Sequence, residues 1–184
     1  MKKIIALLSL AFWVMGSGLT HADLGAGMGN PSAKTMVKKG KAALKAGRLE
    51  EAFDWFLRGA KKEDPEAENM AGKCYENALG TPKSEAEAAT WYKKSALQGF
   101  PDGENNMANC YMHGIGTNKD DLYAFKYYHQ AATHGSAAAA YNLGYIYEGG
   151  VGVPRNMDAA KHFYHMAAKK GYTLAQSRLR QLER

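Results

Sequence analysis

The chain has 184 residues, of which 46% are hydrophobic and 23% are charged, and its formal net charge is +6. This balance is typical of a globular protein with one domain and argues against wholesale disorder. The positive excess is mild, and neither a basic helix pattern nor a platform of stacking aromatic residues occurs, so we expect no nucleic-acid partner.

The first 22 residues have the pattern of a secretory signal peptide. Lys2 and Lys3 precede the apolar segment 4–15, which is too short to span a membrane. Ala22 then supplies the small residue that a cleavage site requires. We therefore expect a periplasmic or secreted protein without stable membrane insertion after cleavage; the alternative is an uncleaved anchor. Loss of residues 1–22 removes two lysines and no acidic residue, which lowers the formal charge from +6 to +4.

A flexible leader and a first helix pair are predicted next. Residues 23–30 are rich in glycine, which favours a flexible segment. Asn30 and Pro31 then provide an N-cap and a first helical residue, so a helix is expected to begin there and to run to residue 46. Apolar residues at helical spacing predict a partner helix over 50–62. Together these helices make the first predicted repeat, residues 31–65.

From residue 66 onward the same residue types return every 36 positions. The copies occupy residues 66–101, 102–136 and 137–172, and residues 173–184 follow as a closing segment. The recurring landmarks are Tyr75, Tyr111 and Tyr147; Gly80, Gly116 and Gly152; Ala88, Ala124 and Ala160; Tyr92, Tyr128 and Tyr164; and Gly99, Gly135 and Gly171. A fixed period of this size is the signature of a repeat solenoid, in which helix pairs bury their apolar faces by stacking.

Two motif resemblances make this prediction more specific. The first pair, with Gly40, Gly47, Ala52 and Phe56, resembles a tetratricopeptide repeat. The later units are similar to Sel1-like repeats, and the clearest copy carries Leu143-Gly144-x-x-Tyr147-x-x-Gly150-x-Gly152-Val153, Asp158-Ala159-Ala160 and Phe163-Tyr164-x-x-Ala167-Ala168-x-x-Gly171. The resemblance implies that residues 31–184 form an all-α, right-handed α-solenoid. It would have about four antiparallel helix pairs, one tetratricopeptide-like and three Sel1-like, plus a C-terminal capping helix.

Cys74 and Cys110 occupy equivalent positions in consecutive repeats, and Ile146 stands there in the next repeat. One interpretation is an apolar core position. The other is a disulfide, because an exported protein meets an oxidising compartment. Equivalent points on packed helices lie about 8–10 Å apart, whereas a disulfide needs Cα atoms within about 7 Å. Both interpretations stay open from the sequence.

The sequence lacks the spacings that carry catalysis in common hydrolases and phosphate-binding enzymes, such as Ser-x-x-Lys, His-Glu-x-x-His, Gly-x-Ser-x-Gly and the P-loop. His162 and His165 could share a helix face, with His129 one repeat earlier, and could make a metal site. However, Lys93 occupies the equivalent position in a preceding repeat, which indicates an exposed slot. We therefore expect no enzyme activity, no cofactor and no metal.

A polar stripe on the first helix of each pair is the strongest candidate site. In tetratricopeptide-like stacks these helices line the concave face, so the resemblance implies that a peptide or protein partner would contact Lys41, Asn69, Lys73, Asn105, Asn106, Asn109, His113, Tyr141, Asn142 and Tyr145. Asparagine can donate to and accept from a peptide backbone at once. The alternative is that asparagine at positions 106 and 142 is an ordinary structural feature of Sel1-like units.

These observations favour a non-catalytic, exported interaction module that binds an unidentified protein or peptide partner on its concave face. A second hypothesis comes from family resemblance, since some Sel1-like proteins are associated with the cell wall. It is a cell-wall protein that binds or hydrolyses muropeptides or β-lactams. Self-assembly through the stack ends is a third possibility.

Overall fold

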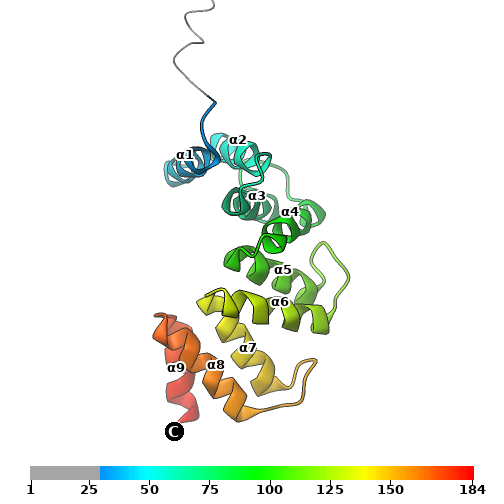
Figure 1. Ribbon diagram of the computed structural model, residues 1–184, viewed down its shortest axis with the longest axis vertical. Helices are drawn as coiled ribbons and strands as arrows, with labels where there is room; N and C mark the ends of the chain where they lie inside the picture. Colours follow the sequence, from blue (N-terminus) through cyan, green and yellow to red (C-terminus); the bar gives the residue numbers. More distant parts are fainter. Residues whose placement is uncertain (1–29) are drawn as a thin grey trace, which may run out of the picture. The chain divides into compact units, whose positions relative to one another are not determined.

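The computed structural model describes residues 30–184, and within them the chain forms nine α-helices and no strand (Figure 1). The helices are α1 (Ala33–Lys45), α2 (Leu49–Ala60), α3 (Pro65–Asn77), α4 (Glu85–Leu97), α5 (Pro101–His113), α6 (Asp121–Thr133), α7 (Ala137–Gly149), α8 (Met157–Lys169) and α9 (Thr173–Leu182). The predicted signal peptide 1–22 and all of the leader except Asn30 lie outside the described residues. No helix in the described part has the length and apolar character that a membrane span requires.

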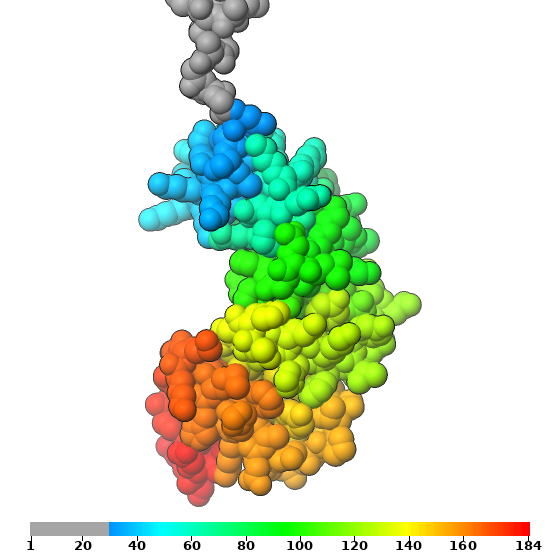
Figure 2. All heavy atoms as spheres, in the orientation of Figure 1, coloured from blue at the N-terminus to red at the C-terminus, as the bar shows by residue number. Residues whose placement is uncertain are grey.

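The helices of residues Ser32–Arg184 pack in chain order into one unit. Each odd-numbered helix from α1 to α7 packs against the helix that follows it, and each pair then packs against the next pair. The first helices of neighbouring pairs also touch, α1 against α3 and α3 against α5, and α9 covers α8 at the C-terminal end. The colour bands in Figure 2 follow this order along the stack. The predicted helical solenoid with a closing helix is confirmed.

Side-chain caps decide where most of the helices begin. Ser32 accepts a hydrogen bond from the Thr35 backbone N–H at 3.2 Å, so α1 begins two residues later than Asn30 and Pro31 suggested. The hydroxyl of serine satisfies an N–H group that would otherwise lack a partner in the first turn. The same role is played at later helices by Asp64, Ser84, Asp120, Ser136 and Asn156.

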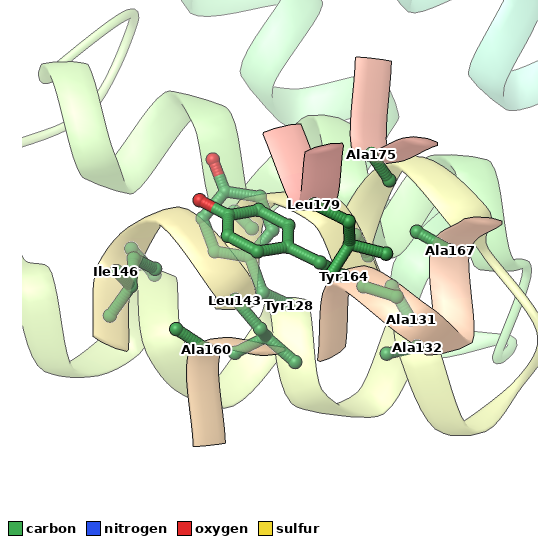
Figure 3. Packing of buried hydrophobic residues seen from close by; sticks show 14 residues of the cluster. Tyr128, Ala131, Ala132, Leu143, Ile146, Ala160, Tyr164, Ala167, Ala175 and Leu179 are labelled. Carbon is green, nitrogen blue, oxygen red and sulfur yellow. The ribbon is translucent and has the colours of Figure 1, made fainter. Parts of the chain in front are cut away.

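A buried tyrosine on the second helix holds each Sel1-like pair together. Tyr92, Tyr128 and Tyr164 are all at most 3% exposed. Tyr164 lies in a cluster with Leu143 and Ile146, and Figure 3 shows its hydroxyl on the same side of the cluster as that of Tyr128. Burial of an aromatic ring of this size removes more apolar surface from water than burial of any alanine around it, so each ring contributes strongly to the stability of its pair.

The mid-helix glycines exist because the tyrosine ring leaves no room for a side chain. A Cβ built on Gly144 would lie 2.5 Å from Cδ1 and Cε1 of Tyr164, and one on Gly72 would lie 2.7 Å from the same atoms of Tyr92. Glycine costs about 1 kcal/mol in a helix relative to alanine. That cost is offset by the close approach of the ring.

The loop glycines set the register between successive repeats. Gly116 has φ 65°, and a Cβ there would overlap the carbonyl oxygen of Glu85, the first residue of α4. Gly80 meets the carbonyl of Leu49, the first residue of α2, in the same way. The loops after α3 and α5 are therefore seated on the second helix of the preceding repeat.

The disulfide between Cys74 and Cys110, which the sequence left open, is not formed, and both cysteines are free and buried. Cys74 packs with Phe56, whereas Cys110 packs with Tyr92 and Met107 in a separate cluster. Each thiol therefore points into the core of its own part of the stack, as the apolar interpretation proposed. Burial raises the pKa of the Cys74 thiol to about 11 and that of Cys110 to about 12, so neither is a thiolate near neutral pH.

We predict that Gly144→Ala lowers the free energy of unfolding by about 1–3 kcal/mol, because the new methyl group must displace the Tyr164 ring. The matched control is Gly149→Ala at the end of the same helix, where the new Cβ would be no closer than 3.4 Å to Val151. We expect that variant to match or slightly exceed the wild-type stability. Urea denaturation measures both, and equal stability of the two variants would contradict the ring-on-glycine contact.

Candidate functional site

The ten predicted site residues all lie on first helices, from α1 to α7. One position recurs on each of these helices, directly after the small residue that touches the aromatic ring of its partner helix. The small residues are Gly40, Gly72, Ala108 and Gly144, and the residues that follow them are Lys41, Lys73, Asn109 and Tyr145. We call the surface around these four residues the first-helix face.

Four of the predicted asparagines are hydrogen-bonded to one another in two pairs that link consecutive repeats. Asn106 on α5 donates from Nδ2 to Oδ1 of Asn69 on α3 at 2.8 Å. Asn142 on α7 donates in the same way to Asn105 on α5 at 3.2 Å, and each pair is 37 residues apart. Asn69 is only 2% exposed, so contrary to expectation it is not accessible to a partner. These amides join consecutive repeats, which supports the structural interpretation.

Two further predicted contacts are also engaged within the stack. Tyr141 packs its ring against Tyr164 and Tyr172, with ring centroids 5.5 and 5.2 Å apart, and so joins α7 to α8 and to the residue before α9. Lys41 forms an ion pair with Glu66 of α3. Lys73 is half-buried, and no acidic group in the described part of the chain lies within ion-pair distance of it.

The remaining predicted residues meet in a groove between α5 and α7. Asn109, His113, Asn142 and Tyr145 line this groove, which has a volume of about 420 Å³. Its apolar lining is made by Met112, Tyr128, Ile146 and Val151, and Lys119 stands at its edge. Tyr145 is 62% exposed and His113 is exposed, so both can reach a bound molecule. We call this the α5–α7 groove.

The α5–α7 groove lies where the repeat pattern of hydrogen bonds changes. Tyr92 donates its hydroxyl to Glu76, and Tyr164 donates to Glu148, both at 2.7 Å. In the repeat between them Met112 occupies the glutamate position, and Tyr128 donates to Asn109 instead. Burial raises the pKa of Tyr128, which keeps its hydroxyl protonated as a donor. The groove therefore contains the thioether of Met112 at the position where the adjacent repeats carry a carboxylate.

The predicted partner contacts include four of the nine residues that line the groove, and the other five are not among them. Tyr128, Ile146, Val151 and Lys119 come from a second helix, a buried position and two loops, which a stripe along first helices does not include. Met112 lies on the same polar stripe of α5, and alignment of Glu76, Met112 and Glu148 at the 36-residue period shows it as the single exception.

At the C-terminal end of the first-helix face an ion pair takes the place of a groove. Arg178 of α9 binds the Glu148 carboxylate through Nη2 and through Nε, the latter at 3.0 Å. The hydrogen bond from Arg178 holds the pKa of Glu148 below its usual value of 4.5, against the opposing effect of burial. Tyr164 donates to the same carboxylate, so one carboxyl group joins three helices.

Two of the histidines that were candidates for a metal site lie beside the ring of Phe163. His129 and His162 both contact Phe163, with ring centroids 6.1 and 5.3 Å apart. Within residues 30–184 no three His, Cys, Asp or Glu side chains are arranged so that they could hold a metal ion.

We predict that Asn106→Ala destabilises the fold by about 1–3 kcal/mol, since it leaves the buried Oδ1 of Asn69 without its donor. Tyr145→Ala, at an exposed position of the same face, should change stability by no more than about 0.5 kcal/mol. Chemical denaturation of both variants checks this. Equal losses would mean that the asparagine ties do not stabilise the stack.

A second prediction concerns the Glu148–Arg178 pair. Because the pKa of Glu148 is lowered in the folded state, its stabilisation is complete above the usual glutamate pKa and is lost as the pH falls through the lowered value. The wild type should therefore exceed Arg178→Gln in stability at pH 7, and the difference should shrink as the pH falls from about 5 to about 3. Thermal melts at each pH measure the difference. Arg180→Gln, which removes a charge on the same helix without an acidic partner, should show no such trend.

The chain is similar to known Sel1 repeat proteins in both sequence and fold. The Sel1 repeat family model matches residues 48–64, 65–100, 101–136 and 137–172. No curated protein matches the chain. A solved Sel1 repeat protein from Oxalobacter formigenes is similar with a TM-score of 0.75 and 33% identity, covering 80% of this chain and 62% of that one. A protective antigen of uropathogenic Escherichia coli with an SLR fold has a TM-score of 0.74 and 32% identity, covering 80% of this chain and 32% of that one.

This chain thus spans less than two thirds of the length of either relative. The family model covers more than half of the sequence, and its matched segments include the helices that line the α5–α7 groove. The predicted resemblance is therefore confirmed, and the chain belongs to the Sel1 repeat family.

Proposed function

We propose that this protein is an exported, non-catalytic module that binds a protein or peptide partner on its first-helix face. Sel1 repeats are generally protein–protein interaction modules, which supports the coarser part of this proposal. The observation that carries the finer part is the α5–α7 groove. It is open, it has an apolar lining, and it is flanked by the exposed side chains of His113 and Tyr145, which form no hydrogen bond or ion pair within the described stack.

The groove offers the contacts that peptide recognition uses. Tyr145 presents a large ring at little cost in conformational entropy, and such aromatic residues are enriched among the residues that dominate binding energy. His113 and Asn142 supply polar groups beside it, and the ring of Tyr128 forms part of the apolar lining. A chain segment laid across α5 and α7 would meet both kinds of contact.

Catalysis is not proposed, because the groove does not contain the groups that hydrolysis needs. Its lining in the described structure includes no serine, threonine, cysteine or carboxylate, so none of the groups that serve most hydrolases as nucleophile or acid stands beside His113. The two cysteines are buried elsewhere as neutral thiols. Export is inferred from the positive and apolar pattern of residues 1–22.

We predict that the double variant His113→Ala and Tyr145→Ala loses a partner that the wild type captures from the exported proteins. The loss should be about tenfold or more, as expected when residues central to an interface are truncated. Leu122→Ala is the matched control, since Leu122 is 70% exposed but lies on α6 outside the groove. The measurement is quantitative affinity capture, with thermal melts that must agree for all three proteins.

A partner retained equally by wild type, control and double variant would place binding elsewhere and contradict the proposal. Capture of muropeptides by the wild type, with no protein captured, would favour the cell-wall alternative. In that case the first-helix face would still be the surface to examine, because tyrosine and asparagine side chains also suit sugar binding.

A further inference from the structure

Met112 lines the α5–α7 groove at a position where the adjacent repeats carry glutamate. Glu76 and Glu148 stand at the equivalent position in the adjacent repeats, and each accepts a hydrogen bond from the buried tyrosine of its own repeat. Met112 has no polar atom to offer, and it is half-buried in the groove lining beside Ile146 and Val151. A thioether side chain is flexible and polarisable, so it adapts to apolar groups of different shape.

The other end of the first-helix face is basic. Helix α1 carries five lysines and no acidic residue. Lys41 and Lys73 occupy the same helical position as Asn109 and Tyr145, and Lys45 occupies that of His113. Lys41 is paired with Glu66, but Lys45 and Lys73 have no acidic partner within the described residues. A positive surface of this kind selects acidic groups on a partner.

We propose that the partner is recognised through a short extended segment with one apolar side chain and nearby acidic side chains. The apolar side chain, of leucine or methionine size, enters the α5–α7 groove and contacts Met112. The acidic side chains lie toward Lys73 and Lys45. This inference rests on the proposed function, since it specifies the partner of the same face.

The spacing within this segment follows from the stack. Helix α5 is in contact with α3, and α3 with α1, so each of the two steps from α5 toward Lys73 and Lys45 is about 8–10 Å. An extended chain advances about 3.3–3.6 Å per residue. One step therefore corresponds to about three residues and two steps to about six. The acidic residues should stand about three to six positions from the apolar residue, on one side of it.

The adjacent repeats suggest a substitution that tests the apolar contact. Met112→Glu recreates the arrangement of the adjacent repeats, in which a glutamate accepts the tyrosine hydroxyl. The variant should therefore fold, and it places a carboxylate where the apolar side chain is proposed to bind. Met112→Leu is the conservative counterpart that keeps the groove apolar.

The experiment begins with selection of random nine-residue peptides, displayed on phage, against the full protein. We expect the enriched peptides to share an apolar residue with acidic residues three to six positions away. Synthetic peptides from this set are then measured by fluorescence anisotropy. Binding should weaken at least tenfold for Met112→Glu and for Lys73→Glu, and should be retained by Met112→Leu. Lys126→Glu, an exposed charge reversal on α6, should have little effect.

A spectroscopic measurement locates the apolar side chain directly. In protein labelled with ¹³C-methyl methionine, the Met112 signal should shift on addition of peptide, with its assignment from Met112→Leu. Met107 is the internal control, because it lies on the same helix but is only 2% exposed. A Met112 signal that does not move while the peptide binds would overturn the proposal.

The outcomes separate this inference from the proposed function. Peptides that are lost by the His113→Ala, Tyr145→Ala double variant but bind Met112→Glu unchanged would overturn the apolar contact and leave the face as the site. Peptides that bind the double variant unchanged would overturn both. Failure to enrich any peptide would overturn recognition through a short segment, and the affinity capture would then decide the proposed function alone.

Discussion

The structure depends on the contact of one aromatic ring with one small residue in each helix pair, and in three of the four pairs this residue is glycine. The ring of Phe56, Tyr92 or Tyr164 lies so close to Gly40, Gly72 or Gly144 that no Cβ fits between them. This contact sets the distance between the two helices, and the loop glycines then seat each pair on the preceding one. Helices of only 10–13 residues would be marginal alone, so their stability comes from this packing.

The third pair shows what happens when this contact changes. Ala108 carries the methyl group that Gly72 and Gly144 lack, and the hydroxyl of Tyr128 there meets Asn109 rather than a glutamate. Met112 therefore takes no part in the hydrogen bond of the tyrosine hydroxyl, and its side chain lines the α5–α7 groove. The candidate site thus arises from a departure from the repeat, whereas the regular positions hold the stack together.

The asparagines illustrate how a binding surface and a structural tie can share one sequence pattern. An amide that could contact a peptide backbone can equally contact another amide, and here two pairs do so between repeats. The polar stripe therefore divides into residues that stabilise the solenoid and residues, such as His113 and Tyr145, that remain exposed. Because the two roles fall on different side chains, substitution of the exposed residues leaves the ties between repeats intact.

The helical repeat, its period and its family follow from the amino-acid sequence alone, because glycine, alanine and tyrosine recur where helix packing demands them. The same pattern restricts the candidate site to the first helices. Three features could be learned only from the folded chain: Asn69 is buried, Cys74 and Cys110 are not bridged, and Tyr128 and Val151 complete the groove. The physical reason is that a period specifies which residues are equivalent, whereas hydrogen bonds and cavities depend on which neighbour each side chain meets across the stack.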